Sequence, residues 1–239
     1  MAAALDNPHI YELRIYELRN DLHPARIQEF FKSAFLPACQ RAGVGPVGCF
    51  TVVAGLQAPA LVVLLDHASM AAMQACLGAM KADAVYAQAC QAFECAAEMP
   101  YVRCDSTLLE AFEAHPKTEI PPFDATRPPR LFELRTYRSR SGTALASKLE
   151  MMNKEEIRIF RACGFAPVFF GAAIAGGRLP HLTYLSGFDN MAARDKAWDS
   201  FRVNADWLRI KATPGWTDPE VVCNVHSSFL LPTDYSQIR

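Results

Sequence analysis

The feature that most constrains this chain is an internal repeat that spans nearly its whole length. Residues 11–19 read YELRIYELR and residues 132–137 read FELRTY, so the pattern Glu-Leu-Arg-x-Tyr returns after 121 residues. The same offset, without a gap, pairs the Gly-x-x-Pro-Val of residues 43–47 with that of residues 164–168. Self-similarity at one fixed period indicates a tandem duplication of a unit of about 105 residues.

A proline-rich segment separates the two copies. Residues 113–129 read EAHPKTEIPPFDATRPP and contain five prolines. Proline lacks a backbone N–H and restricts the chain, which disfavours regular structure and favours an extended spacer. The sequence therefore predicts a first unit at residues 1–112, a linker at residues 113–129 and a second unit at residues 130–239.

Hydrophobic periodicity and turn residues predict the same order of elements, β-α-β-β-α-β, in each unit. In the second unit, the Gly that ends GTALASKLEMMNKEEIRIFRACG is the residue expected just past a helix C-terminus. In the first unit we expect strands at 10–18, 44–55, 60–67 and 101–112 and helices at about 23–42 and 69–93. In the second unit we expect strands at 131–138, 165–175, 179–188 and 221–231 and helices at about 142–163 and 190–211.

This element order predicts an α+β fold of two ferredoxin-like units, each an antiparallel sheet with both helices on one face. The other face of each sheet would be bare, so the two units should pack sheet to sheet as an α+β barrel. The barrel could close within one chain or between two chains. We expect a homodimer or a higher homo-oligomer.

Charge and composition exclude some classes of partner. The net charge is −1, so we expect neither nucleic acid nor a membrane surface as a partner. The two halves nevertheless differ: residues 1–120 hold 8 basic and 13 acidic side chains, and the rest of the chain holds 16 and 12.

Cysteine usage and the start of the chain predict a cytoplasmic protein. The eight cysteines form no C-x-x-C pair and most lie in apolar runs, which is typical of reduced, buried thiols. The opening MAAALDNPH has no basic region followed by an apolar core, and the longest apolar stretch is broken by Pro and Gly. We therefore expect no secretory signal and no membrane span.

Alternation along the first strand of each unit separates an apolar set of side chains from a Glu/Arg/Tyr set. We expect the apolar set to cover the helices and the polar set to face the interior between the sheets. Buried charges there need partners. They could form a structural Glu–Arg pair capped by Tyr, or a pocket in which Arg clamps a carboxylate or enolate while Tyr donates and Glu takes a proton. They could also lie on an exposed face. The residues are Glu12, Arg14 and Tyr16 in the first unit and Glu133, Arg135 and Tyr137 in the second.

Differences between the copies favour the second unit as the place of any chemistry. His181 stands where the first unit has Ala60, and His226 stands where it has Asp105. Neutral histidine is a natural general base near pH 7. His181 could instead be a turn residue and His226 could face either side of its strand. The candidate catalytic residues are therefore Glu133, His181 and His226.

Two tryptophans of the second unit replace other residues of the first. Trp198 stands where the first unit has Leu77, and Trp207 stands where it has Tyr86. They lie on an amphipathic helix at a spacing that puts them on about the same face. We expect both to be core residues that cover the sheet.

The strand motif YELR-x-Y, the Gly-x-x-Pro-Val segment and residues 188–215, FDNMAARDKAWDSFRVNADWLRIKATPG, resemble the NIPSNAP family. The resemblance covers both units and implies the dimeric α+β barrel superfamily fold. Distant members of that superfamily include cofactor-independent monooxygenases, haem-handling enzymes and small isomerases. A shared fold does not by itself transfer any of these activities.

The chain lacks the motifs of nucleotide binding, zinc hydrolysis and serine esterases. We expect no cofactor and no metal, although a single His or Tyr can ligate haem iron. Two hypotheses stay open. One is a barrel that binds a small aromatic or enolisable acid, as a cofactor-independent oxygenase or isomerase. The other is a non-catalytic structural or protein-interaction module. A cavity of several hundred Å³ between the sheets would favour the first.

Overall fold

The computed structural model describes residues 8–19, 23–55, 57–96, 101–122 and 124–239. The residues before Pro8, where we expect no secretory signal, lie outside the described part. Within the described residues the two units share the same order of elements, apart from one additional short helix in the second unit.

The first unit has the predicted strands, while each of its predicted helices is interrupted. Its elements are β1 (Ile10–Glu17), α1 (His23–Phe30), the π-helical turn η1 (Phe31–Phe35), α2 (Leu36–Arg41), β2 (Val47–Ala54), β3 (Ala60–His67), α3 (Met70–Ala82), α4 (Ala84–Glu94) and β4 (Arg103–Ala111). The break before α4 lies at Asp83, whose side chain caps the new helix by accepting a hydrogen bond from the N–H of Tyr86.

The second unit repeats this arrangement and adds one short helix. Its elements are β5 (Leu131–Arg138), α5 (Gly142–Met151), the π-helical turn η2 (Met152–Glu156), α6 (Ile157–Ala162), β6 (Ala166–Ala175), β7 (His181–Phe188), α7 (Met191–Val203), α8 (Ala205–Ile210), α9 (Asp218–Val221) and β8 (Asn224–Pro232). Asn204 breaks and caps the second helix as Asp83 does in the first unit. The sequence did not predict α9, which precedes the segment expected to be the last strand and overlaps it only at Val221.

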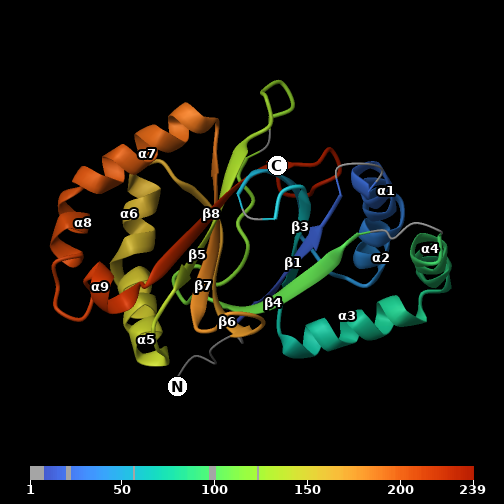
Figure 1. Ribbon diagram of the computed structural model, residues 1–239, viewed down its shortest axis with the longest axis horizontal. Helices are drawn as coiled ribbons and strands as arrows, with labels where there is room; N and C mark the ends of the chain where they lie inside the picture. Colours follow the sequence, from blue (N-terminus) through green and yellow to red (C-terminus); the bar gives the residue numbers. More distant parts are fainter. Residues whose placement is uncertain (1–7, 20–22, 56, 97–100, 123) are drawn as a thin grey trace, which may run out of the picture.

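The strands of both units form one closed antiparallel barrel in the order β1-β3-β2-β8-β5-β7-β6-β4, with β4 returning to β1. Figure 1 shows this barrel between two groups of helices, α1–α4 on one side and α5–α9 on the other. Pairing between the units occurs at two seams, β2 with β8 and β4 with β6. The α+β barrel predicted from the sequence is confirmed, and it closes within one chain.

The first strand of each unit turns its two faces the opposite way from the prediction. Tyr11 points into the barrel, where its ring centroid lies 5.1 Å from that of Phe169 in the second unit. Tyr16 points outward and packs against Phe31 of the helical layer, 5.2 Å between ring centroids. The expectation that the Glu/Arg/Tyr sets face the interior between the sheets is therefore wrong.

The physical reason is that both faces of each sheet are buried. Helices cover one face and the opposite barrel wall covers the other, so alternation separates the faces without saying which is which. The narrow interior of an eight-stranded barrel is filled by side chains from every strand, and apolar ones fill it best. Three apolar clusters result, one inside the barrel and one between each half of the sheet and its helices.

The described part of the linker has no helix and no ladder strand, and it is held to both units. The N–H of Thr118 donates to Asp66 of β3, and the N–H of Glu119 donates to the Val168 carbonyl of β6. His115 is fully buried and its Nε2 lies 3.0 Å from the same carbonyl. The linker thus packs across the barrel on the side where β4 pairs with β6.

The chain has no candidate membrane span among its described helices. None of these helices combines the length and the apolar character that crossing a bilayer requires.

The β4–β6 seam gives a testable prediction about the fold. A Cβ at Gly171 of β6 would lie 2.7 Å from the Leu109 Cβ and 3.3 Å from the Tyr11 ring. We expect Gly171→Ala to lower the free energy of unfolding by about 1–3 kcal/mol, because this contact cannot relax without moving the seam. Chemical denaturation measures the difference.

The matched control is Gly78→Ala in α3, where a Cβ meets nothing within 4 Å. We expect this change to be neutral or to stabilise by up to about 1 kcal/mol, because Ala favours a helix. Equal effects of the two substitutions would contradict the close packing of the seam.

Candidate functional site

Strand β5 divides the predicted site residues between two cavities. Glu133, Arg135 and Tyr137 face the helices of the second unit, while Thr136 and Arg138 face the inside of the barrel. The candidate histidines lie on the barrel side. The structure therefore does not bring Arg135 and Tyr137 together with His181 and His226.

Glu133 is the most completely hydrogen-bonded of these residues. Its buried carboxylate accepts two hydrogen bonds from Arg194 (2.8 and 2.9 Å) and one from Arg135 (2.8 Å). Trp198 Nε1 and the Ser227 hydroxyl donate two more, at 2.9 and 2.6 Å. Burial alone would raise the pKa of Glu133, but these donors and the charge of Arg135 outweigh it and lower the pKa to about 2.

This environment argues against Glu133 as a general base. A carboxylate with so low a pKa has little affinity for a proton near neutral pH, and its acceptor positions are already occupied. Glu133 instead holds Arg135 and Trp198 in place beside the cavity that they line.

Glu12 is the counterpart of Glu133 in the first unit. Arg14 donates to both of its oxygens, at 2.6 and 2.9 Å, and Ser106 donates at 3.2 Å. Burial opposes ionisation of Glu12, but His67, Arg14 and Ser106 together lower its pKa to about 2. The Glu–Arg pair within one strand is thus present in both units.

The tyrosine of the motif has different partners in the two units. Tyr137 OH lies 3.3 Å from Arg135 Nε and 3.0 Å from the hydroxyl of Tyr184. Burial raises the pKa of Tyr184 well above its usual value. Tyr16 packs edge-on against Phe31 and Tyr101.

A cavity of about 520 Å³ lies between the sheet and the helices of the second unit, and we call it the outer cavity. Cations and aromatic rings alternate around it. The Arg135 guanidinium lies 4.5 Å from the Trp198 ring centroid, and Lys148 Nζ lies 5.7 Å from that of Trp207. The outer cavity is lined by Arg135, Tyr137, Lys148, Glu156, Arg194, Trp198, Phe201, Arg202, Trp207, Asp218, Val222, Cys223, Asn224 and Val225.

A buried ion pair stands at the wall of the outer cavity. Lys148 Nζ lies 2.6 Å from Glu156 Oε2, and both side chains are almost fully buried. The π-helical turn η2, which ends at Glu156, adds a residue to the helix, so that two residues eight apart share a face. Ile27 and Phe35 occupy the equivalent positions of the first unit, and both are buried.

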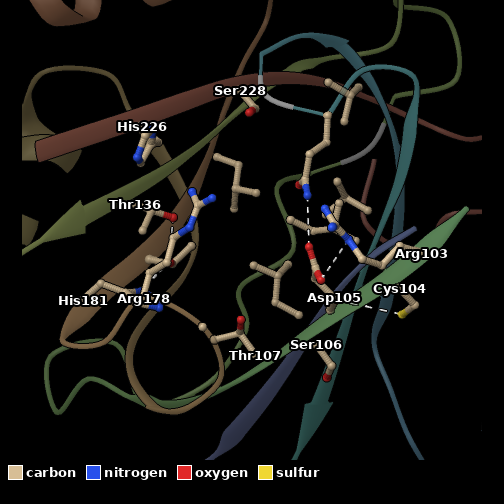
Figure 2. A pocket seen from close by; sticks show the side chains of 18 of the residues that line it. Arg103, Cys104, Asp105, Ser106, Thr107, Thr136, Arg178, His181, His226 and Ser228 are labelled. Carbon is tan, nitrogen blue, oxygen red and sulfur yellow. Dashed lines mark hydrogen bonds and ion pairs between the residues drawn. The ribbon is translucent and has the colours of Figure 1, made fainter. Parts of the chain in front are cut away.

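A second cavity, of about 630 Å³, opens at one end of the barrel, and we call it the mouth cavity. Figure 2 shows Thr136, Arg178, His181 and His226 on one side of it, facing Arg103 and Asp105 on the other. Its lining residues are Leu13, Ile15, Val52, Gln57, Val62, Arg103, Cys104, Asp105, Ser106, Thr107, Leu134, Thr136, Arg138, Gly177, Arg178, His181, Thr183, His226 and Ser228.

Both candidate histidines line the mouth cavity. His181 is buried, and its Nδ1 lies 3.4 Å from the Thr183 hydroxyl, which in turn lies 2.9 Å from that of Thr136. His226 Nε2 is buried without a hydrogen-bond partner among the described residues. The pKa of both histidines is lowered, mainly by burial, and the charge of Arg138 acts in the same direction.

No set of three or more His, Cys, Asp or Glu side chains in the described ranges is arranged to hold a metal ion. The two histidines therefore have no third ligand of this kind beside them in the described part of the mouth cavity.

The two repeated units also match a known family. The model of the NIPSNAP family matches residues 11–106 and 132–237, which together make up most of the chain. The chain belongs to the NIPSNAP family. Each match falls within one structural unit, so this is a NIPSNAP protein with two tandem copies of the family domain.

Solved structures similar to this NIPSNAP protein share its whole barrel at low sequence identity. A presumed monooxygenase from Lactobacillus acidophilus has a TM-score of 0.59 at 11% identity, and the match covers 94% of each chain. A presumed monooxygenase from Fusobacterium nucleatum has a TM-score of 0.58 at 9% identity, covering 95% of this chain and 93% of its own.

An anthrone oxidase-like protein has a TM-score of 0.54 at 12% identity, covering 95% of this chain and 92% of its own. These likenesses show the fold. No curated protein matches the chain.

Several residues of both cavities were missed in the sequence. Lys148, Glu156 and Arg194 lie on helix faces that otherwise carry core residues, and charges there are a signal that a partner or a ligand is present. Arg138 and Arg178 of the mouth cavity were harder to recognise as site residues, since arginine is common at strand ends and in turns. Trp198 and Trp207 are core residues as predicted, and they also line the outer cavity.

The hydrogen bonds of Glu133 predict a specific acid sensitivity. Its folded-state pKa of about 2 lies below the ordinary value of 4.5, so this stabilisation is present above pH 4.5 and is lost as pH falls towards 2. We expect Glu133→Gln to lower the free energy of unfolding at pH 7 by about 3 kcal/mol, because two guanidinium groups lose a shared charge. Urea unfolding between pH 7 and pH 3 measures both effects.

The variant should also lose that part of the acid dependence which wild type shows below pH 4.5. The control is Glu113→Gln, a change at an exposed glutamate that should leave the pH profile as in wild type. A Glu133 variant with the wild-type profile would show that Glu133 is not the source of the dependence.

Proposed function

We propose that this NIPSNAP protein binds a small aromatic acid in the outer cavity of the second unit. The observation that carries the proposal is the alternation of cations and aromatic rings around a space of about 520 Å³. Such a cavity is large enough for a small ligand, and convergent polar groups on apolar walls are typical of binding sites.

The cations explain why the ligand should be an acid. Arg135 donates through Nη1 to Glu133 and through Nε to Tyr137, while its Nη2 meets no acceptor in the part of the chain that the structure describes. Arg194 pairs with Asp195 as well as with Glu133, so the open donor beside the cavity is the Nη2 of Arg135. A ligand carboxylate would accept a hydrogen bond from this Nη2.

The aromatic rings explain why the ligand should carry a ring. Trp198, Trp207 and Tyr137 border the cavity, and flat rings stack favourably with a ligand ring. The first unit has Leu77 and Tyr86 at the positions of the tryptophans. An aromatic ligand also agrees with the name of the anthrone oxidase-like neighbour.

Binding is tested with 1-naphthoate and, as a neutral analogue, 1-naphthalenemethanol. Tryptophan fluorescence reports occupancy, because Trp198 and Trp207 line the cavity. We expect naphthoate to quench the fluorescence at lower concentration than the alcohol. Arg135→Gln should weaken naphthoate binding about tenfold or more, since a hydrogen bond to a charged group is lost.

The matched control is Arg14→Gln at the equivalent position of the first unit, which should leave binding within about twofold of wild type. Arg194 still pairs with Glu133 in the Arg135 variant, so the fold should persist. An Arg135 variant that does not fold would favour the structural module, and equal loss in both variants would exclude the outer cavity as the site.

Catalysis on the bound acid is a second candidate, favoured by the Lys148–Glu156 pair. The pair gives the cavity wall a buried proton donor beside a buried acceptor. An enolisable acid held by Arg135 could give a proton from carbon to Glu156 and take one back from Lys148. Such an isomerisation needs no cofactor, and the names of the presumed monooxygenases point to a related oxygenase as the other form of this candidate.

Proton abstraction is tested by exchange. Phenylpyruvate in D₂O should gain deuterium at its CH₂ carbon faster with the protein than in buffer, as followed by ¹H NMR. Glu156→Gln should remove the acceleration, while Glu155→Gln, at a more exposed glutamate paired with Arg158, should keep it. Naphthoate binding together with an absent acceleration would leave a binding protein without this activity.

The compartment and the oligomeric state belong to the same proposal. All eight cysteines are free, and four of them are buried, which supports a reducing compartment such as the cytoplasm. A homo-oligomer stays a prediction, since one chain closes the barrel by itself.

A further inference from the structure

The mouth cavity lies where the two units meet, and both units line it with equivalent strand positions. With the offset of 121 residues, Ile15 corresponds to Thr136, Asp105 to His226, and Gln57 to Arg178. The cavity therefore lies close to the axis that relates the two units. Its two walls would be alike if the units had kept the same residues.

The outermost pair of residues shows how the walls differ. In the first unit Glu17 of β1 lies opposite Arg103 of β4, and the two form an ion pair of 3.2 Å. In the second unit the same positions hold Arg138 of β5 and Asn224 of β8. The second wall has kept a cation and has no carboxylate opposite it.

The next inward pair of residues shows the same change. Asp105 in the first wall lies 3.4 Å from Arg103 and accepts a hydrogen bond from Gln57. Its counterpart in the second wall is His226, whose Nε2 has no hydrogen-bond partner in the described ranges. A carboxylate of the first unit is again replaced in the second unit, here by an imidazole that can donate a hydrogen bond.

Two guanidinium groups of the second wall are unpaired. The side chains of Arg138 and Arg178 form no hydrogen bond or ion pair with any described residue. Both lie close enough to His226 for their charge to lower its pKa. Arg103, the cation of the opposite wall, is already neutralised by Glu17 and Asp105.

The backbone at Arg178 is held in a conformation that side chains disfavour. Arg178 has φ of 63°, and Gln57 at the equivalent position has the same φ. Residues other than Gly rarely adopt this left-handed region, and such residues cluster at functional sites. The turn before β7 thus keeps an arginine at the mouth where glycine would fit with less strain.

The base of the mouth cavity is apolar. Leu13, Ile15, Val62 and Leu134 line it from both units. A ligand that fills the cavity therefore meets hydrocarbon at its inner end and unpaired cations at its outer end.

We propose that the mouth cavity is a second binding site, for an organic anion with an apolar body, whose acid group lies between Arg138, Arg178 and His226. The acid group takes the place of the carboxylates that the first wall has and the second wall lacks. The site is on the opposite face of β5 from the outer cavity, and it does not depend on the proposed function there.

Octanoate is the probe, with 1-octanol as a neutral molecule of the same chain length, and calorimetric titration of the full chain measures both. We expect octanoate to bind and octanol to bind at least about tenfold more weakly, because the alcohol cannot pair with the two arginines. Equal affinity for the two probes would overturn the proposal.

The first variant transfers the pair of the first wall into the second. In Arg138→Glu with Asn224→Arg, the second wall gains the ion pair that Glu17 and Arg103 form in the first. We expect this double variant to fold and to lose octanoate binding by about tenfold or more. Unchanged binding in the folded double variant would overturn the proposal.

The second variant, Arg178→Gly, separates binding from folding. Gly accepts a positive φ without strain, so the melting temperature should stay the same or rise while octanoate affinity falls by about tenfold. Affinity equal to that of wild type would count against a role for Arg178 and against the site as proposed.

Arg127→Gln is the control, because it removes a cation that pairs with Asp189 and does not line the mouth cavity. We expect octanoate affinity within about threefold of wild type. A loss as large as that of Arg178→Gly would show attraction by surface charge alone.

Arg135→Gln tests whether octanoate occupies the outer cavity instead. It should leave octanoate binding unchanged. Loss of octanoate binding in that variant would place the ligand in the outer cavity and overturn the assignment to the mouth.

Discussion

The pairing of β2 with β8 and of β4 with β6 is the constraint on which the rest of the structure depends. Each unit alone is a four-stranded sheet with helices on one face, and its other face is apolar. The two seams satisfy the edge strands and bury both apolar faces in one step. They also fix which side chains face the interior, so the positions of both cavities follow from them.

The order of elements and the duplication were readable from the sequence because each has a clear signal. Gly164, with φ of 93°, marked the end of the first helix of the second unit, and the repeat at one offset marked the duplication. The breaks at Asp83 and Asn204 were missed, although both are residues that favour helix N-caps. Both residues lie inside a continuous helical pattern of hydrophobic residues, so one unbroken helix was predicted at each place.

The assignment of the faces could not be read from the strand alone. Tyr11 and Tyr16 are both buried, one inside the barrel and one under helices, so alternation gave two buried faces of similar hydrophobicity. A charged residue on the helices indicated the orientation of the strand better. Arg194 of α7 needed a buried partner, and the Glu/Arg/Tyr face turned towards it supplies Glu133. The two histidines line a different cavity from Arg135.

Because the barrel closes within one chain, the two walls of the mouth cavity can carry different residues, which they cannot do in a symmetric dimer. In a dimer of identical units, a cavity on the two-fold axis has the same residues on both walls, and a cation without a carboxylate on one wall is repeated on the other. In this chain the Glu17–Arg103 pair persists on the first wall, while the second wall has Arg138 opposite Asn224. Duplication within one chain therefore allowed the two walls to diverge in charge. The net charges of the two halves of the chain, −5 for residues 1–120 and +4 beyond, have the same signs as the differences at these walls.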